Sequence, residues 1–212
     1  YTEFDDDDFL VRLRNLIFNP ERRNAMSKNG RKIIDGKGAD RVLSKMANLT
    51  PPPLSTSHLG LRHASIDDAM LLWEWVNDPI VRSNSFNSQD ISIENHIDWY
   101  RKKLASEDTV IYILEMDKIP VAQIRYDCGK NECATISFSV ASRYRGCGLG
   151  EQTLLMSAKR ACRELGVKKL NGAVLDDNEA SKRTFIKAGF RRIGLKNISD
   201  KVSHIFLWEC PE

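Results

Sequence analysis

The segment that most constrains the fold is Arg145–Gly150, which stands between an apolar run and a long helical pattern. The apolar run, Ala134–Val140, is typical of a buried strand. The pattern from Gly150 to Leu165 repeats apolar residues at helical spacing. A strand that turns through glycines into a helix exposes backbone N–H groups at the positive end of the helix dipole. The segment therefore predicts a site for a phosphate, although a plain strand-to-helix turn has the same composition.

The glycine spacing excludes two common nucleotide-binding loops. The dinucleotide fingerprint requires Gly-x-Gly-x-x-Gly early in a βαβ unit, whereas these glycines stand at positions 146, 148 and 150. The Walker loop ends in Gly-Lys-Ser or Gly-Lys-Thr, whereas this loop ends in Gly150 and Glu151. What remains is Arg-x-x-Gly-x-Gly. In this pattern Gly148 and Gly150 allow a positive φ or a close approach to a pyrophosphate, and Arg143 or Arg145 adds positive charge.

Composition narrows the class of protein. Of the 212 residues, 42% are hydrophobic and 29% are charged, and the formal net charge is +3. These proportions are typical of a globular protein, and so small a charge gives no support for a nucleic-acid partner. No apolar run reaches the ~18 residues of a membrane-spanning helix. We therefore expect a cytoplasmic protein that binds neither nucleic acid nor membrane.

The cysteines favour free thiols over a disulfide framework or a zinc site. They are odd in number and include no Cys-x-x-Cys pair. We therefore expect free thiols in a reducing compartment and no metal. The five positions are Cys128, Cys133, Cys147, Cys162 and Cys210.

The pattern along the chain indicates two domains and a linker. In residues 1–50, an acidic first turn at Asp5–Asp8 and apolar residues at helical spacing predict a small all-helical segment. Its second helix is expected to begin at Pro20. Residues 51–58 are rich in proline and serine, which is typical of a linker. The second domain therefore covers residues 59–212, with the boundary near residue 55.

From Leu59 onward the pattern alternates between strands and helices. One strand and two helices come first, followed by three strands, the glycine loop with its helix, and finally a strand, a helix and two strands. These elements predict the α/β (α+β) class, with a mixed sheet of about seven strands and flanking helices. The expected strands are Leu59–Ala64, Val110–Glu115, Val121–Tyr126, Ala134–Val140, Lys169–Leu175, Phe190–Leu195 and Val202–Trp208, and the expected helices are Ile66–Asn77, Ile93–Leu104, Gly150–Leu165 and Glu179–Lys187.

A second motif follows the glycine loop at the distance of one helix and one strand. It places Asn178, Ser181, Phe185, Gly189 and Phe190 at the spacing Asn-x-x-Ser-x-x-x-Phe-x-x-x-Gly-Phe. In this order the two motifs resemble the GNAT superfamily of N-acetyltransferases over about residues 59–209. The resemblance implies the GNAT fold and acetyl-coenzyme A as cosubstrate.

The same resemblance implies where the cofactor binds. The pyrophosphate would lie on the N–H groups of the glycine loop. The pantetheine arm would pair with backbone that the preceding strand exposes where it splays from its parallel neighbour. Asn178 would hydrogen-bond the arm, and it is also a good N-cap for the helix that follows. The implied cofactor-binding residues are Phe138, Ser139, Val140, Arg145, Gly146, Cys147, Gly148, Leu149, Gly150, Asn178, Ser181 and Phe185.

The implied reaction is direct attack of an amine on the thioester in a ternary complex. A backbone N–H near Val140 would polarise the carbonyl, and a base would accept the amine proton. His96 and Glu132 are the expected catalytic residues, with Asp98 as a further candidate. An imidazole has a suitable pKa, but His96 also fits as a half-buried helix residue. Many family members have a tyrosine acid where this chain has Phe185, which carries no proton to donate.

A narrower resemblance concerns the acceptor. Residues 73–99, which begin WEWVNDP, resemble acetyltransferases of nucleotide-linked amino sugars, such as those of pseudaminic acid synthesis. Trp75 and Trp99 would stack on a base or a sugar, and Arg82 would contact a diphosphate. Tryptophans at helical spacing are also common in protein cores. The implied substrate residues are therefore Trp75, Arg82 and Trp99.

The N-terminal segment resembles a different protein of the same pathway. Asn19–Ser27 and Ile34–Val42 resemble the carboxyl end of its nucleotide-sugar hydrolase, which has a glycosyltransferase-like fold. We therefore expect residues 1–50 to be the tail of a fused hydrolase domain without hydrolase activity. A plain helical extension is the alternative.

The expected function is acetyl transfer to the 4-amino group of a UDP-linked 4-amino-4,6-dideoxy sugar. The partner is then a small nucleotide sugar, and a homodimer is compatible with the sequence. One alternative is acetylation of protein N-termini, of the ribosomal-protein type. Another is a non-catalytic module that binds acyl-coenzyme A. Phe185 is compatible with this alternative because its side chain cannot act as an acid.

Overall fold

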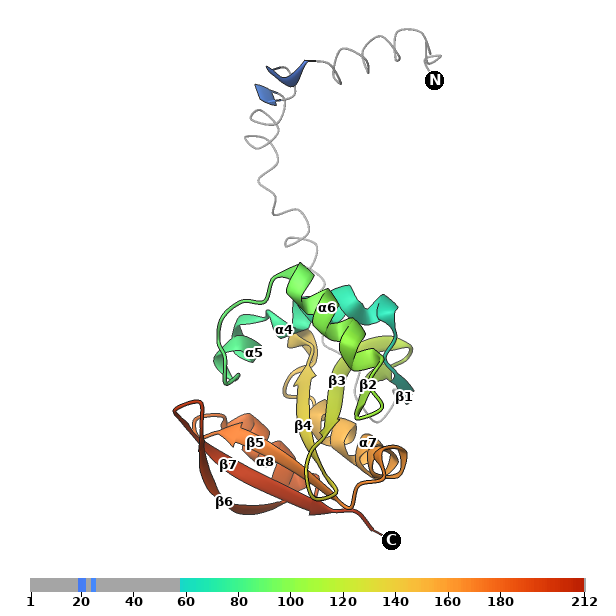
Figure 1. Cartoon of the computed structure of the whole chain (residues 1–212), viewed down its shortest axis with the longest axis vertical. Coiled ribbons are helices and arrows are strands. Elements are labelled where there is room, and N and C mark those ends of the chain that lie inside the picture. Colours follow the sequence, from blue (N-terminus) through green and yellow to red (C-terminus); the bar gives the residue numbers. More distant parts are fainter. Residues whose placement is uncertain (1–18, 22–23, 26–57, 212) are drawn as a thin grey trace. The chain divides into compact units, whose positions relative to one another are not determined.

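The computed structural model describes residues 19–21, 24–25 and 58–211, and Figure 1 draws the whole chain. The chain divides into two units, Tyr1–Thr50 and Pro51–Glu212. Pro20 and Glu21 are helical, as are Asn24 and Ala25. The other helices expected in residues 1–50, and nearly all of the linker expected at residues 51–58, lie outside the described residues.

One seven-stranded mixed sheet organises the second unit, in the order β1-β2-β3-β4-β5-β7-β6 (Figure 1). All neighbouring strands are antiparallel except β4 and β5, which are parallel. A parallel pair needs a crossover connection, and α7 supplies it. The mixed sheet predicted from the sequence is therefore confirmed. The strands are β1 (Leu59–His63), β2 (Thr109–Met116), β3 (Ile119–Cys128), β4 (Cys133–Val140), β5 (Lys169–Leu175), β6 (Arg191–Ile198) and β7 (Lys201–Glu209).

Helices cover both faces of this sheet. Alternate residues of β2 enter different clusters: Tyr112 packs with Leu154 of α7, whereas Ile113 packs with Tyr100 of α6. Because successive strand residues point to opposite faces, α7 and α6 lie on opposite sides of the sheet. The helices are α4 (Ala69–Val76), α5 (Pro79–Ser83), α6 (Ile93–Leu104), α7 (Leu149–Leu165) and α8 (Glu179–Lys187), with 3-10 turns at Ile66–Asp68 and Ser142–Tyr144.

The short helix α5 was not expected from the sequence. Asp78 and Pro79 end α4, as predicted, but they also begin a new helix. Pro79 occupies its first position, and the Asp78 carboxylate accepts hydrogen bonds from the N–H groups of Ile80 and Val81. A carboxylate cap followed by proline is a strong helix start. Three α-helices therefore lie between β1 and β2, where the sequence predicted two.

The described residues include no helix long and apolar enough to cross a bilayer. The longest helix, α7, has seventeen residues and carries charged side chains along one side. Gly148 is its N-cap and Gly166 its C-cap, and the φ of Gly166, 64°, is left-handed. Glycine adopts this conformation without a steric penalty, so it ends the helix where the sequence predicted.

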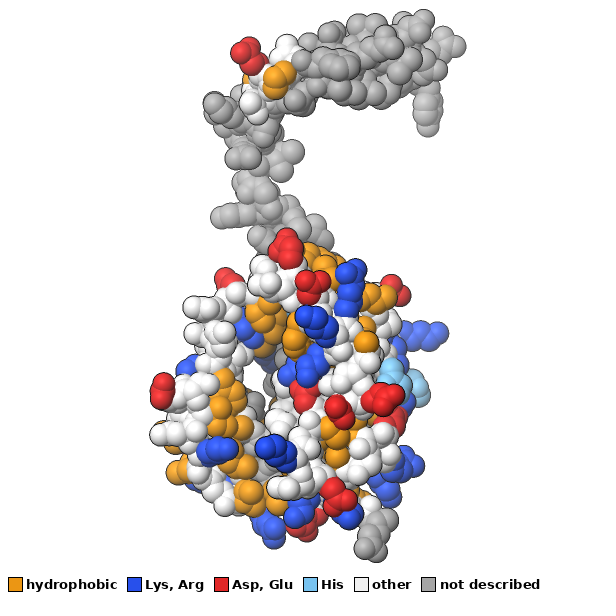
Figure 2. All heavy atoms as spheres, in the orientation of Figure 1, with side chains coloured by type: hydrophobic (Ala, Val, Ile, Leu, Met, Phe, Trp, Pro, Cys, Tyr) orange, Lys and Arg blue, Asp and Glu red, His pale blue; other side chains and the backbone are white. Residues whose placement is uncertain are grey.

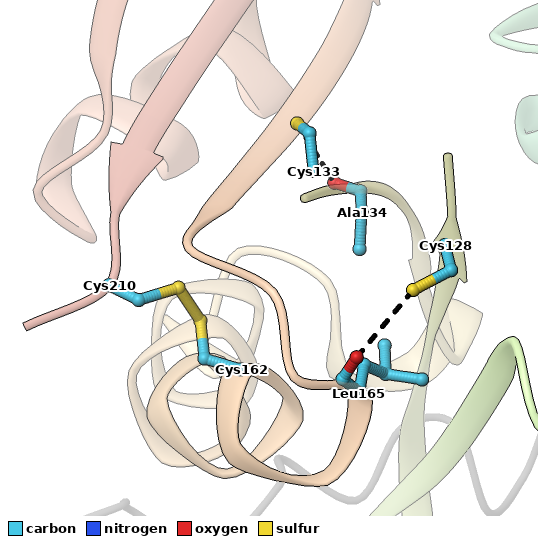
Figure 3. Close-up of a disulfide and its surroundings, with 6 residues drawn as sticks. All are labelled: Cys128, Cys133, Ala134, Cys162, Leu165 and Cys210. Atoms are coloured by element: carbon cyan, nitrogen blue, oxygen red, sulfur yellow. Dashed lines mark hydrogen bonds between the residues drawn. A yellow bond between two sulfur atoms is a disulfide. The ribbon is translucent and has the colours of Figure 1, made fainter. Parts of the chain in front are cut away.

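One pair of cysteines corrects the expectation of free thiols. Cys162 of α7 and Cys210, just after β7, form a disulfide whose Cα atoms are 6.3 Å apart (Figure 3). The two residues meet because the N–H of Cys210 donates to the carbonyl of Lys168, close to the end of α7. The residues are 48 positions apart, so no local pattern shows the pairing. Cys128, Cys133 and Cys147 are free thiols, as expected.

Candidate active site

The parallel strands β4 and β5 separate halfway along their length. Cys133–Ile136 pair with Lys169–Gly172, and beyond this register β4 continues to Val140 and β5 to Leu175 without pairing to each other. Figure 1 shows the strands diverging, and Figure 2 shows the surface hollowed between them. The splay implied by the family resemblance is therefore present. We call this opening the split.

Backbone N–H groups of β4 face the split. The N–H of Ala141 donates to the carbonyl of Val121 on β3 at 2.9 Å. Because backbone groups alternate in direction along an antiparallel ladder, every second residue before Ala141 also bonds to β3. The N–H groups of Phe138 and Val140 consequently point the other way, into the split. A ligand that carries amide groups can extend the sheet at this edge.

The glycine loop leads directly into the first turn of α7. Gly146 and Gly148 have φ values of 79° and 81°, in the left-handed region that favours glycine. Gly148 is the N-cap and has no side chain to occupy the first N–H groups of the helix. Leu149 is buried and anchors the turn, and the thiol of Cys147 donates only to a backbone carbonyl of the loop. The open N–H groups and the helix dipole suit an anion.

Gly150 is explained by helix packing. A Cβ at this position would lie 3.1 Å from Cγ2 of Thr184 on α8 and 3.3 Å from Cε2 of Phe138 on β4. The missing side chain therefore lets α7 approach both elements beside the split. The sequence suggested a close approach to pyrophosphate as the reason for this glycine, and these internal contacts give a second reason that needs no ligand.

Arg145 is bound within the protein. Its Nη2 lies 2.8 Å from the Asp78 carboxylate, and its Nε donates to the carbonyl of Val140 at 3.2 Å. Burial acts to raise the pKa of Asp78, but the bonds from Arg145 and from backbone N–H groups outweigh it and hold the pKa below its ordinary value. Arg145 therefore ties the glycine loop to the start of α5. Its charge is balanced by Asp78 and is not free for a ligand.

Asn178 caps α8, which is one of the two roles expected of it. Its Oδ1 accepts a hydrogen bond from the N–H of Ser181 at 3.0 Å. Its amide nitrogen has no partner among the residues that the structure describes. The cap and a bond from this nitrogen to a ligand are therefore compatible.

Phe185 fills the core at the base of the split. Its side chain is buried, its ring stacks on Phe206 at 5.2 Å, and it meets Phe138 edge-on at 5.7 Å. A Cβ at Gly172 would lie within 2.6 Å of Cε1 of Phe185, so Gly172 makes room for the ring. Gly172 was missed by the sequence reasoning. The available signal was a glycine inside the apolar strand Lys169–Leu175.

His96 lies between α6 and the residues that open α4. It is 3% exposed, its ring stacks on Tyr100 at 5.7 Å, and its Nε2 has no partner in the described part of the chain. Burial lowers the pKa of His96, and a hydrogen bond to the backbone of Ala69 opposes that effect only in part. The ring is therefore neutral near pH 7, with an unused lone pair.

Glu132 and Asp98 are both exposed. Glu132 lies in the turn between β3 and β4, where its carboxylate is 3.0 Å from Nζ of Lys168. The whole of β4 separates it from Ala141, a distance of about 30 Å for nine residue steps at 3.3 Å each. The structure therefore places Glu132 at the opposite end of β4 from the glycine loop. Asp98 lies on α6.

Arg82 does not occupy the position expected of a diphosphate ligand. Its guanidinium donates to the carbonyls of Asn87 and Gln89 and to the hydroxyl of Ser85, at 3.2 to 3.3 Å. The side chain is buried, and burial lowers its pKa. Arg82 therefore holds the loop that follows α5.

The two tryptophans expected to bind substrate differ in exposure. Trp75 is half-buried and packs against two core clusters, one that contains Leu114 and one that contains Leu72. Trp99 of α6 is 37% exposed, and the guanidinium carbon of Arg125 lies 4.8 Å from its ring centroid. Only Trp99 therefore offers a ring to a ligand at the surface.

A set of polar side chains lies on the α6 side of β3 and β4, and we call it the polar face. Arg125 and Lys103 both contact the Asp127 carboxylate at 2.6 Å. Burial acts to raise the pKa of Asp127, but these cations outweigh it and the pKa lies below its ordinary value. The sequence reasoning missed this face, although polar residues alternate with apolar ones along β3. The cross-strand pairs are Gln123 with Ser139, Arg125 with Ser137, and Asp127 with Thr135.

A hydrogen bond joins β7 to the loop after α5, beyond the open end of the split. Lys201, the first residue of β7, donates from Nζ to the carbonyl of Ser85 at 2.9 Å. Ser85 belongs to the loop that Arg82 holds after α5, 116 residues away in sequence.

Solved structures share this fold. The aminoglycoside acetyltransferase AAC(6')-Ib, solved with coenzyme A and kanamycin, has 19% sequence identity and a TM-score of 0.63, covering 72% of this chain and 95% of its own. Spermidine N-acetyltransferase from Vibrio cholerae, solved with coenzyme A and spermine, has 15% identity and a TM-score of 0.64, covering 71% and 95%. At these identities the likeness establishes the fold.

A match between the sequence and a family profile establishes the family of this chain. No curated protein resembles the chain closely enough to count as a match. The family profile described as "Acetyltransferase (GNAT) domain" matches residues 58–191, from the start of β1 to the first residue of β6. This range contains the split, the glycine loop and Asn178. The chain is therefore an acyltransferase, and it belongs to the GNAT acetyltransferase family.

Proposed function

We propose that the chain transfers the acetyl group of acetyl-coenzyme A to the 4-amino group of a UDP-linked 4-amino-4,6-dideoxy sugar, by direct attack in a ternary complex. The observation that carries the donor half is the split between β4 and β5, which opens beside the glycine loop. The first turn of α7 suits the pyrophosphate. The N–H groups of Phe138 and Val140 suit the amides of the pantetheine arm.

In this proposal catalysis depends on holding the two reactants together and on polarising the thioester carbonyl. The arm holds the thioester against the backbone of β4, where an N–H near Val140 donates a hydrogen bond to the carbonyl oxygen and stabilises the negative charge that develops on it. The amine attacks the carbonyl carbon and its proton passes to a base. The C–S bond then breaks, and coenzyme A leaves as the thiolate, which takes a proton from water. Holding both reactants together replaces a collision in solution. Phe185 contributes packing and no proton.

Of the two bases expected from the sequence, we retain His96. Its burial keeps it neutral and its Nε2 carries no hydrogen bond, which suits a group that must accept a proton. Glu132 is set aside because all of β4 separates it from the glycine loop.

The acceptor half of the proposal rests on the polar face and on the resemblance of residues 73–99. Trp99 offers a ring on which a uracil or a sugar can stack. The guanidinium beside it, on Arg125, is paired among the described residues with Asp127 through Nε alone, so that, unlike in Arg145, both terminal nitrogens are left to bind a diphosphate with two parallel hydrogen bonds. We therefore assign to Arg125 the role that the sequence suggested for Arg82. Ser137, opposite Arg125, belongs to the strand that borders the split.

The experiment that tests the proposal measures release of free thiol from acetyl-coenzyme A. The acceptors compared are a UDP-linked 4-amino-4,6-dideoxy sugar, a peptide with a free N-terminus, kanamycin and spermine. We expect turnover with the nucleotide sugar only. Turnover with the peptide and not with the sugar would support the N-terminal acetyltransferase instead, and turnover with kanamycin or spermine alone would replace the acceptor by a polyamine.

A further inference from the structure

A hydrogen bond between His204 of β7 and Asp176, which follows β5, holds the turn that carries Asn178. Nε2 of His204 and Oδ1 of Asp176 are 2.6 Å apart. His204 is buried, and its Nδ1 has no partner in the described part of the chain. A carboxylate can only accept a hydrogen bond, so the proton of this contact is carried by Nε2. His204 therefore donates to the Asp176 carboxylate, and that bond holds the pKa of Asp176 below its ordinary value.

Backbone and lysine contacts hold the same turn. The N–H of Asp176 donates to the carbonyl of Val202 at 3.1 Å, and Nζ of Lys182 donates to the carbonyl of Asp176 at 2.7 Å. The N–H of Asn178 donates to the carbonyl of Leu175 at 3.0 Å. Among the described residues, only His204 forms a hydrogen bond with the side chain of Asp176. That bond can therefore be removed while the backbone contacts stay in place.

The turn held by His204 and Asp176 borders the split. Ile136 and Gly172 form the last pair of the parallel register. If that register continued, Val140 would stand opposite Asp176, four residues further along each strand. The turn that begins at Asp176 therefore faces the part of β4 whose N–H groups are open, and Asn178 ends it with a free amide nitrogen.

We propose that His204 is a positioning residue for the coenzyme. It fixes Asp176 and thereby the turn that presents the Asn178 amide to the pantetheine arm. The inference rests on the proposed function, since it requires coenzyme A in the split. Nothing in the sequence motif pointed to His204, which lies 26 positions after Asn178 on another strand.

Three substitutions distinguish the effect of the hydrogen bond on coenzyme A binding from effects of charge and of protein stability. The Asp176 side chain is 66% exposed, so Asp176→Ala removes the bond and leaves no cavity. Asp177→Ala removes an equal charge from the next residue, whose exposed carboxylate makes no hydrogen bond in the described structure. Asp176→Asn removes the charge but keeps an oxygen that can accept from His204.

The measurement is the dissociation constant of coenzyme A by calorimetry, which needs no acceptor. We expect Asp176→Ala to weaken binding about tenfold, the effect of one hydrogen bond, with Asp177→Ala and Asp176→Asn close to wild type. Equal affinities of the wild type and the Asp176→Ala variant for coenzyme A would overturn the positioning role of His204 but not the proposed function. An Asp176→Asn variant as weak as Asp176→Ala would also overturn it, because the charge would then be the cause. No binding by the wild type would overturn the proposed function as well.

A double-mutant cycle tests whether the pair acts through Asn178. Asn178→Ser keeps an oxygen that can cap α8 but lacks the amide nitrogen. We expect Asp176→Ala to weaken coenzyme A binding about tenfold in the wild-type background and to have no further effect in the Asn178→Ser background. Equal loss in both backgrounds would show that Asp176 acts independently of Asn178, and would overturn the positioning role.

Discussion

Phe185 lies against Gly172, the last residue of β5 that pairs with β4. The ring occupies the space that any side chain at Gly172 would need. The Gly172→Ala variant must therefore move the ring or the strand, which we expect to cost about 1–3 kcal/mol of stability. Urea unfolding measures this change. Gly60→Ala is the control, because Gly60 also lies in a strand but has nothing within 4 Å of its missing Cβ. Equal stability of the two variants would contradict this packing.

Stability should fall on mild acidification because of His96. Burial places the pKa of His96 in the folded protein below the ordinary value of about 6.5. Between these two values the unfolded chain binds more protons than the folded one, so stability decreases as the pH falls through this window. We expect the His96→Gln variant to show a flatter decline between about pH 7 and pH 5, measured by thermal unfolding. His58→Gln, at an exposed position, is the control and should decline as steeply as the wild type.

The helix and strand boundaries that the sequence predicted best are those with local signals. Ser92 caps α6 through the N–H of Asn95, Gly166 ends α7, and Asn178 caps α8. Each signal acts within a few residues, so a single sequence contains it. The parallel crossover could be predicted for the same reason, because the glycine loop stands directly between a strand and a helix.

The site residues that the sequence misjudged depend on distant contacts. Arg82 and Arg145 read alike as free cations, but one is enclosed by its own loop and the other is paired with Asp78. Arg125 and His204 gave no motif, since their partners lie on other strands or helices. A sequence shows that a charge is present, whereas the fold decides which group neutralises it.

Arg125 should affect the acceptor and leave the donor unchanged. In the Arg125→Gln variant the guanidinium beside Trp99 is lost, and we expect the KM for the acceptor to rise by about tenfold, as for loss of one charged contact. The KM for acetyl-coenzyme A should not change. Arg160→Gln is a matched control, because Arg160 stacks 4.9 Å from the Tyr112 ring on the α7 side of the sheet. An equal rise in both variants would indicate a general loss of structure.

The disulfide between Cys162 and Cys210 should contribute to stability. It closes a loop of 48 residues, and removing such a constraint from the unfolded chain costs up to about 4 kcal/mol. We expect a reducing agent to lower the melting temperature of the wild type and to leave the Cys210→Ser variant unchanged. Cys147→Ser, which removes a free thiol, should respond to the reducing agent as the wild type does. A wild type insensitive to reduction would contradict the expected contribution.

The hydrogen bond from Lys201 to Ser85 gives the split a second closed end. At one end β4 and β5 are still paired, at Ile136 and Gly172. At the other end this bond joins β7 to the loop after α5. The split is therefore bounded along the strands at both ends, by the paired register at one end and by this bond at the other. Under the proposed function, β7 and the loop after α5 therefore bound the space in which an acceptor would meet the thioester.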